Sequence, residues 1–186
     1  MLLQEGKREL LFLTLFYIHT HNAYWSTILL LLLLYFFRSP RADFRSNDNQ
    51  ILSPSYGTIQ NISNNNNQIC ISIILKLNDV HTQYIPYTGN ITSLKHINGT
   101  FNPLYLTSFE KTKNNERFYT QIKTKFGYIS IIQFAGMIAR RIVNNLSTKT
   151  IAEKGDIFGM IKFSSRVDLI VPKHCSINVN VHLNVS

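Results

Sequence analysis

The pattern of hydrophobic and polar residues divides the chain into an apolar beginning and a longer part with alternating positions. Apolar residues dominate 10–18 and 23–37, and the polar sequence His19-Thr20-His21-Asn22 separates the two runs. Neither run reaches the roughly 20 residues that a helix needs to cross a bilayer, but together they suffice for one imperfect span or a shallow hairpin. We therefore expect residues 1–37 to form a hydrophobic membrane helix or hairpin that anchors the chain.

Other interpretations of this beginning have less support. A cleaved signal peptide would need a small-residue cleavage site after the leucine run, and the sequence has none there. A helix buried in the protein core is the remaining alternative. The aromatic residues Tyr24, Trp25 and Tyr35 suit the boundary between lipid and water. His19 and His21 are simpler to interpret as a polar break between two apolar runs than as metal ligands.

Beyond residue 45 the apolar runs become short and alternate with polar positions, which is typical of half-buried strands. Residues 118–125 and 128–135 with Gly127 between them predict a hairpin. Only residues 136–146 resemble a helix. Residues 69–77 place one set of apolar side chains on a common face: Ile69, Ile71, Ile73, Leu75 and Leu77. Further strands are expected at 157–163, 166–171 and 177–185. The fold class is therefore mainly β (α+β), with a sandwich or barrel-like body of short strands over residues 38–186.

Composition and charge narrow the classes of function. The 186 residues carry 19 Lys and Arg against 10 Asp and Glu, a net charge of +9, which favours an anionic partner. Cys70 and Cys175 form no ligand cluster, so neither a disulfide scaffold nor a structural zinc site is expected. The apolar beginning favours an anionic phospholipid membrane over nucleic acid. A nucleic-acid binder stays an alternative because of Arg140-Arg141 and the lysines at 111, 113, 123 and 125.

Common catalytic signatures are missing from the sequence. Gly155 and Gly159 lack the third glycine and the Lys-Ser/Thr pair of a phosphate-binding loop. The sequence also has no G-x-S-x-G elbow and no H-E-x-x-H helix. The chemistry must come from another arrangement of residues.

Six separated segments share one distinctive order. They are FFRSP at 36–40, SPSYG at 53–57, NDVH at 78–81, NER at 115–117, AGMIARR at 135–141 and FSSRVD at 163–168. In order and spacing they resemble the phosphatidylserine decarboxylase family, closest to its short, archaeal-type form, over roughly residues 36–172. The family pattern has FFRDP, SPADG, a strand ending in VH, NER, AG-x-x-ARR and GSRVD.

The resemblance implies a self-processing, membrane-associated enzyme. Ser165 would attack the carbonyl of Ser164, and the chain would separate into a long chain, 1–164, and a short chain, 165–186. The new end at Ser165 would carry a pyruvoyl group, which replaces pyridoxal phosphate in this family, and no metal is implied. His81 matches the family's histidine and would act as the base during cleavage and as the acid during decarboxylation. Asp168 is expected to face outward from its strand.

Two residues depart from the family pattern. Tyr56 stands where the family has the aspartate that orients and charges the histidine, and a phenol has almost no negative charge at neutral pH. Ser164 stands where the family has glycine, and a strained backbone there would cost serine about 1–3 kcal/mol. Asp79 lies two residues before His81, and on a strand both would share one face, so Asp79 could substitute for the missing carboxylate.

The resemblance therefore implies a decarboxylase that converts phosphatidylserine into phosphatidylethanolamine and carbon dioxide. Arg140 and Arg141 could bind the lipid phosphate, or equally hold a loop through salt bridges. The expected location is a membrane, the expected partners are anionic phospholipids and not nucleic acid, and a homo-oligomer is compatible with this interpretation. The alternative is a homologue that binds membrane lipid but no longer cleaves itself.

Overall fold

A computed structural model describes residues 7–20, 23–39, 48–65, 67–104, 109–137, 141–148, 150–162, 165–177 and 184–185. The chain forms two compact units, residues 1–41 and residues 42–186. Each unit is described by itself.

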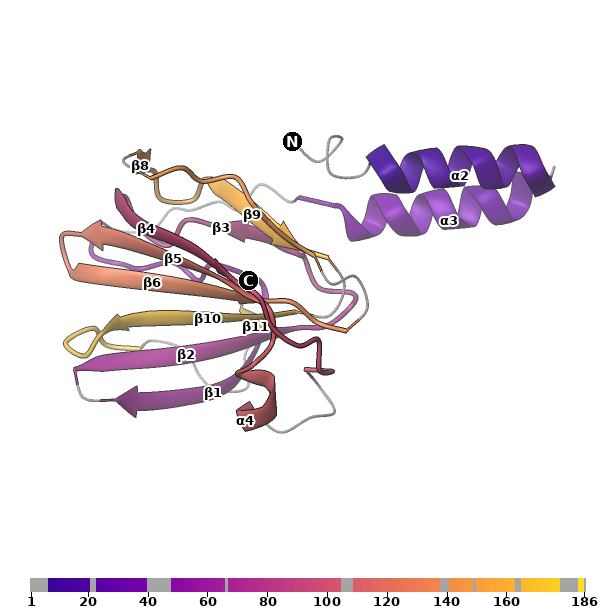
Figure 1. The fold of residues 1–186 in the computed structure, drawn as a ribbon. Helices are drawn as coiled ribbons and strands as arrows, with labels where there is room; N and C mark the ends of the chain where they lie inside the picture. Colours follow the sequence, from indigo (N-terminus) through magenta and orange to yellow (C-terminus); the bar gives the residue numbers. More distant parts are fainter. Residues whose placement is uncertain are drawn as a thin grey trace. The chain divides into compact units, whose positions relative to one another are not determined.

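The first unit consists of two helices of 14 residues, α2 (Lys7–Thr20) and α3 (Ala23–Phe36), which pack against each other (Figure 1). Leu13 and Ser26 are buried, whereas Leu15, Trp25 and Leu31 are each more than half exposed. Within the described residues, neither helix combines the length and hydropathy that crossing a membrane requires. Of the two expected forms, a membrane helix or a hairpin, a membrane-spanning helix is not supported, because the apolar segment is divided between two shorter helices.

The second unit is built from antiparallel strands in two sheets (Figure 1). The larger sheet has the order β11-β1-β2-β10-β6-β5-β4-β8, and the smaller has the order β3-β9-β7. The elements are β1 (Gly57–Asn65), β2 (Gln68–Leu75), β3 (Thr82–Tyr84), β4 (Gly89–Ile97), α4 (Phe109–Thr112), β5 (Arg117–Thr124), β6 (Gly127–Phe134), β7 (Ile142–Asn144), β8 (Ile151–Ala152), β9 (Ile157–Ile161), β10 (Ser165–Pro172) and β11 (Asn184–Val185).

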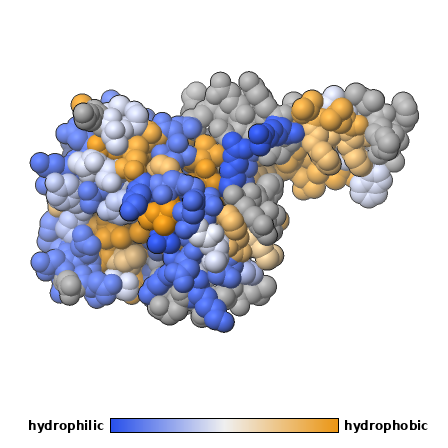
Figure 2. Space-filling model, in the orientation of Figure 1, coloured by the Kyte–Doolittle hydropathy of each residue, from blue (hydrophilic) through white to orange (hydrophobic). Residues whose placement is uncertain are grey.

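One hydrophobic core contains residues from both sheets, so the two layers pack face to face. The larger sheet contributes alternate residues, including Ile71 and Ile73 of β2 and Val167 of β10, and the smaller sheet contributes Phe158 and Ile161 of β9. This arrangement confirms a mainly β fold with few helices. Figure 2 shows hydrophilic side chains over much of the visible surface of this unit, and hydrophobic ones gathered over α2 and α3.

The predicted strands are largely present, with two corrections. Residues 118–125 and 128–135 form the expected hairpin of β5 and β6, in which Gly127 has a positive φ of 107°. Leu77 was expected on the same strand face as Ile73 and Leu75 but lies in a turn after β2 and is 57% exposed. The helix expected over 136–146 is absent from its described part, because Ile142–Asn144 pairs with β9 as strand β7. Two β-branched residues, Ile142 and Val143, favour that strand.

The last expected strand is described in part. The structure has Asn184–Val185 as β11, paired with the start of β1, while residues 178–183 lie outside the described residues.

Candidate functional site

Two connections between the sheets bring distant parts of the sequence to one end of the core. Residues 76–81 lead from β2 of the larger sheet to β3 of the smaller one, and residues 162–164 lead from β9 back to β10. Ser165 is the Cα partner of Leu75, the last residue of β2, and Thr82 is the Cα partner of Met160. The end of β2 is paired with the start of β10, and the start of β3 is paired with the end of β9. His81 and Ser165 therefore lie at the same end of the sandwich.

Ser165 begins β10 and is completely buried. It lies two residues before Val167, a core residue, so the alternation of the strand directs its side chain toward the smaller sheet. Among the described residues, its Oγ has no hydrogen-bond partner. A buried hydroxyl without a partner is costly in a purely structural position, and this makes Ser165 a candidate for chemistry. Ser164 lies outside the described residues.

His81 is completely buried immediately before β3. Its Nδ1 lies 2.8 Å from the carbonyl oxygen of Asp79. A carbonyl oxygen can only accept a hydrogen bond, so Nδ1 carries the proton and Nε2 is the basic nitrogen of the neutral ring. The main chain therefore fixes the imidazole in the tautomer that a general base needs at Nε2.

Asp79 does not lie on a strand, which removes the geometric reason for treating its carboxylate as the partner of His81. It closes a turn in which its Oδ2 accepts the Lys76 amide proton at 2.7 Å and its own amide donates to the Lys76 carbonyl at 3.0 Å. The strand premise was wrong because the chain bends between β2 and β3. Asp79 orients His81 through its carbonyl group, while its carboxylate stabilises the turn.

Tyr56 immediately precedes β1 and is half-buried. Its ring centroid lies 6.0 Å from that of Tyr84 in an edge-to-face arrangement. The Tyr84 amide also donates to the Pro54 carbonyl at 2.9 Å. Gly57 follows with a φ of 142°, and a Cβ there would lie 2.4 Å from the Ile74 carbonyl oxygen. This close approach between β1 and β2 sets Tyr56 beside the end of β2, and β10 begins with Ser165 at the same end.

The predicted arginines are only partly described. Arg140 lies outside the described residues, and the exposed Arg141 precedes β7. The Arg141 carbonyl accepts a hydrogen bond from the Lys162 amide at 3.2 Å, which brings its main chain beside the connection that leads to Ser165. Lys162 is 4% exposed and was missed by the sequence analysis. A lysine directly after the apolar run 157–161 is the signal that could have identified it.

A buried polar network joins the two sheets next to His81. The Gln133 amide on β6 donates to Gln83 Oε1 on β3, and Asn144 Nδ2 on β7 donates to Gln133 Oε1 at 2.9 Å. Asn144 Nδ2 also lies 3.1 Å from the Thr120 hydroxyl on β5. These bonds fix the position of β3, whose first residue, Thr82, directly follows His81. Sequence reasoning missed the network because its members come from four separate strands.

An ion pair lies on the opposite face of β10 from Ser165. Arg166 Nε is 3.1 Å from Asp168 Oδ1, and both residues are buried. Burial raises the pKa of Asp168, an effect that the Arg166 guanidinium opposes. Burial likewise lowers the pKa of Arg166, which Asp168 opposes. Asp168 was expected to face outward. Its side chain does point away from the core, but Asp168 is buried on that face of the sheet as well.

Cys70 lies on the same face of the larger sheet as Asp168 and is partly buried. Burial, and next the Asp168 carboxylate, raise its pKa from 9.0 to about 11. The thiol is therefore protonated at neutral pH and is a poor nucleophile.

Comparison with known proteins places the chain among relatives of one kind. The family model described as phosphatidylserine decarboxylase matches residues 29–186. A phosphatidylserine decarboxylase proenzyme of Streptomyces griseus is 35% identical over 150 residues, which cover 80% of this chain and 67% of the relative. A protein of the same name from Ehrlichia chaffeensis is 36% identical over 165 residues, covering 85% and 70%. A putative archaetidylserine decarboxylase proenzyme of Methanosarcina acetivorans is 33% identical over 159 residues, covering 86% and 73%.

Proposed function

Because the chain belongs to the phosphatidylserine decarboxylase family, we propose that it is a proenzyme that cleaves itself before Ser165 and then decarboxylates phosphatidylserine. The observation that carries this proposal is the placement of two buried residues at one end of the sandwich, His81 just before β3 and Ser165 at the start of β10. The proenzyme names of the relatives support the self-cleavage.

The proposed cleavage uses only groups of this chain and one water molecule. Ser165 Oγ attacks the carbonyl carbon of residue 164, and the peptide C–N bond is replaced by an ester while the nitrogen becomes an amine. Loss of the Ser165 Cα proton then breaks the Cβ–Oγ bond, which leaves a carboxylate on residue 164 and a dehydroalanine at 165. The dehydroalanine becomes an imine, and water hydrolyses it to a pyruvoyl group and ammonia.

His81 is the proposed proton carrier. Its Nε2 accepts the Ser165 hydroxyl proton, since Nδ1 is committed to the Asp79 carbonyl at 2.8 Å. The same imidazolium then supplies a proton to the leaving nitrogen. Burial of both residues excludes competing water from the ester. These steps require no aspartate for orientation, because a main-chain carbonyl already holds the ring.

Residue 165 fits a pyruvoyl group. The side chain is small and completely buried, and among the described residues its hydroxyl has no structural bond that the conversion would break. Such a group supplies a carbonyl electron acceptor for the decarboxylation of an amine-bearing substrate. His81 would then return a proton to the substrate carbon. Arg141, exposed beside the connection to Ser165, and its neighbour Arg140 are the proposed contacts for the lipid phosphate.

The lipid would be reached at a membrane surface. The net charge of +9 favours an anionic bilayer, at about 1 kcal/mol for each well-placed basic residue. The exposed apolar side chains of α2 and α3 are proposed to enter one leaflet as a helical hairpin rather than to span the bilayer.

A second candidate function is a homologue that binds lipid without cleaving itself. Tyr56 favours it, because this ring packs against Tyr84 where the family pattern has a charged aspartate. In a serine-protease triad, loss of the orienting carboxylate costs about four orders of magnitude in rate. Processing occurs once per molecule, so a slow cleavage is still sufficient for the enzyme.

The test is a decarboxylation assay with the purified full chain and vesicles that contain phosphatidylserine. We expect phosphatidylethanolamine and carbon dioxide from the wild type and neither from Ser165→Ala. Vesicles in which phosphatidylglycerol replaces phosphatidylserine control for anionic charge. Binding to both vesicles without carbon dioxide release would favour the lipid-binding homologue and contradict the enzyme.

A further inference from the structure

Self-cleavage removes a covalent constraint on the position of residue 165. The inference drawn from this rests on the proposed function. Once the bond to residue 164 breaks, the new chain end is held only by non-covalent contacts. β10 pairs with β2 from Ser165 to Pro172, but its pairing with β6 begins only at Arg166. Residue 165 therefore has a described strand partner on one side, and free strand ends tend to fray.

The next residue, Arg166, is held on three sides. Its Nη1 donates to the Thr112 hydroxyl at 2.7 Å, and its Nε lies 3.1 Å from Asp168 Oδ1. The guanidinium carbon lies 4.0 Å from the centroid of the Phe134 ring. The side chain is 2% exposed and points away from the core, opposite to Ser165. A planar guanidinium can satisfy these three contacts together, and an ammonium group cannot.

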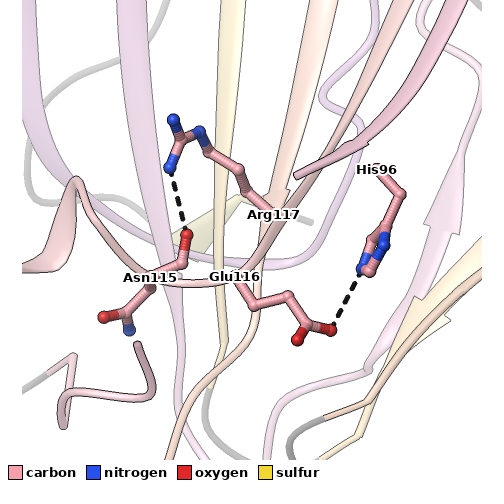
Figure 3. Close-up of polar contacts among 4 residues, drawn as sticks. All are labelled: His96, Asn115, Glu116 and Arg117. Atoms are coloured by element: carbon pink, nitrogen blue, oxygen red, sulfur yellow. Dashed lines mark hydrogen bonds and ion pairs between the residues drawn. The ribbon is translucent and has the colours of Figure 1, made fainter. Parts of the chain in front are cut away.

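Thr112 belongs to a hydrogen-bonded segment, residues 112–117, which we call the 112–117 support. The Asn115 amide donates to the Thr112 carbonyl at 3.1 Å, and Asn115 Nδ2 reaches the Ala135 carbonyl at 3.0 Å. Arg117 Nη1 donates to the Asn115 carbonyl at 3.2 Å (Figure 3). Asn115 is completely buried. Since Ala135 follows Phe134 directly, the support is attached to the end of β6, against which Arg166 packs.

We propose that Arg166 is a positioning residue that fixes residue 165 after self-cleavage by attaching the start of β10 to the 112–117 support. It does not touch the reacting atoms, because it lies on the other face of the sheet. Before cleavage the connection through residue 164 holds this end of β10, and Arg166 is then less needed. The contribution of Arg166 to the stability of this strand end is therefore larger in the cleaved chain than in the uncleaved chain. A purely structural role in folding would be the same in both.

The test compares wild type, Arg166→Lys and Arg166→Met in both states of the protein. Ser165→Ala, alone and combined with each Arg166 variant, supplies the uncleaved state. Lys123→Met is the matched control, because this residue is an exposed cation on β5 of the same sheet. Hydrogen exchange of the amides of residues 166–172 reports on β10, and the decarboxylation rate per carbonyl group reports on the site.

In cleaved Arg166→Met we expect exchange of this segment to rise about tenfold and the rate per carbonyl to fall by about ten- to a hundredfold. Arg166→Lys should lie between wild type and Arg166→Met, and Lys123→Met should change neither quantity. In the Ser165→Ala background the Arg166 variants should change exchange less than about twofold.

Equal exchange in cleaved wild type and cleaved Arg166→Met would overturn the positioning role. An equal increase in the uncleaved background would also overturn it, since Arg166 would then serve folding in general. Wild-type chain that stays in one piece on denaturing electrophoresis would instead contradict the proposed function, and the positioning role with it.

Discussion

Tyr56 and Ser164 occupy two positions at which the family pattern has an aspartate and a glycine, and both bear on cleavage. The Tyr56 ring lies edge-on to Tyr84, and Ser164 precedes the bond to be cleaved. Tyr56 is not among the described residues of the hydrophobic core that joins the sheets. Its replacement should therefore change the rate of processing more than the stability of the fold.

We predict that Tyr56→Asp combined with Ser164→Gly accelerates self-cleavage by about tenfold or more, because a carboxylate stabilises the imidazolium of His81. The measurement is the fraction of cleaved chain against time on denaturing electrophoresis. The same pair of substitutions in the Ser165→Ala background is the control and should give no fragment. A folded double variant that cleaves no faster than wild type would show that these positions are assigned wrongly.

A second prediction concerns Cys70 and alkaline pH. Because its pKa is raised from 9.0 to about 11, the unfolded chain loses the thiol proton first as pH rises between these values. The contribution of the protonated thiol to the free energy of unfolding is therefore fully present below pH 9 and is lost as the pH approaches 11. Going from about pH 8 to about pH 10.5, wild type should lose about 2 kcal/mol more unfolding free energy than Cys70→Ala.

Denaturant titrations at the two pH values check this difference. Cys175→Ala is the control, since burial raises the pKa of that thiol without the added effect of a carboxylate, and its effect should be smaller. Equal losses in wild type and Cys70→Ala would contradict the burial of the Cys70 thiol beside Asp168.

Single residues were predictable where a motif identified them. Ser165 and His81 came from the family resemblance, and the structure brings the two to one end of the core. Gln83 and the buried contacts of Arg166 were not predictable, and the only signal for Lys162 was its position directly after an apolar run. Their roles depend on which strands become neighbours and which faces are covered, and a local pattern does not contain that information. Asp168 illustrates this, because alternation indicated its direction from the strand but not the segment that covers it.

At the scale of elements, a period of two predicted the central strands well. β2, β5, β6, β9 and β10 all lie where alternating apolar residues placed them. The errors occur where the chain leaves a strand. Leu77 continues the alternation of β2 but lies in the turn that Asp79 closes, and β7 is a short strand with too few residues to show a period.

The helical pair α2 and α3 supports a prediction about membranes. Leu31 and Leu32 are 60% and 58% exposed. If these side chains enter a leaflet, Leu31→Glu with Leu32→Glu should reduce vesicle binding at least tenfold, because a charge in the hydrocarbon costs about 2–3 kcal/mol. Sedimentation with vesicles of phosphatidylcholine and phosphatidylserine measures the bound fraction.

The control for this prediction replaces exposed apolar residues of the other unit. Tyr128→Glu with Ile151→Glu adds the same charge to side chains that are 48% and 70% exposed. We expect this pair to bind nearly as well as wild type. Equal losses in the two double variants would mean that net charge, rather than the helical pair, governs binding.

At the scale of the whole molecule, the site depends on complete folding of residues 42–186. Tyr56, His81 and Ser165 are separated in the sequence and come to the same end of the sandwich only when both sheets have formed. Cleavage should therefore follow folding, as a consequence of non-local contacts that form late. The order of the six segments was sufficient to predict the family, whereas the two-sheet topology had to come from the structure.

The most direct measurement of the central claim is the mass of the purified full chain after prolonged incubation at neutral pH. The account predicts two species, residues 1–164 and residues 165–186, with a carbonyl group that reacts with hydroxylamine at the start of the shorter one. A single chain of 21.5 kDa with an unmodified serine at position 165 would contradict it.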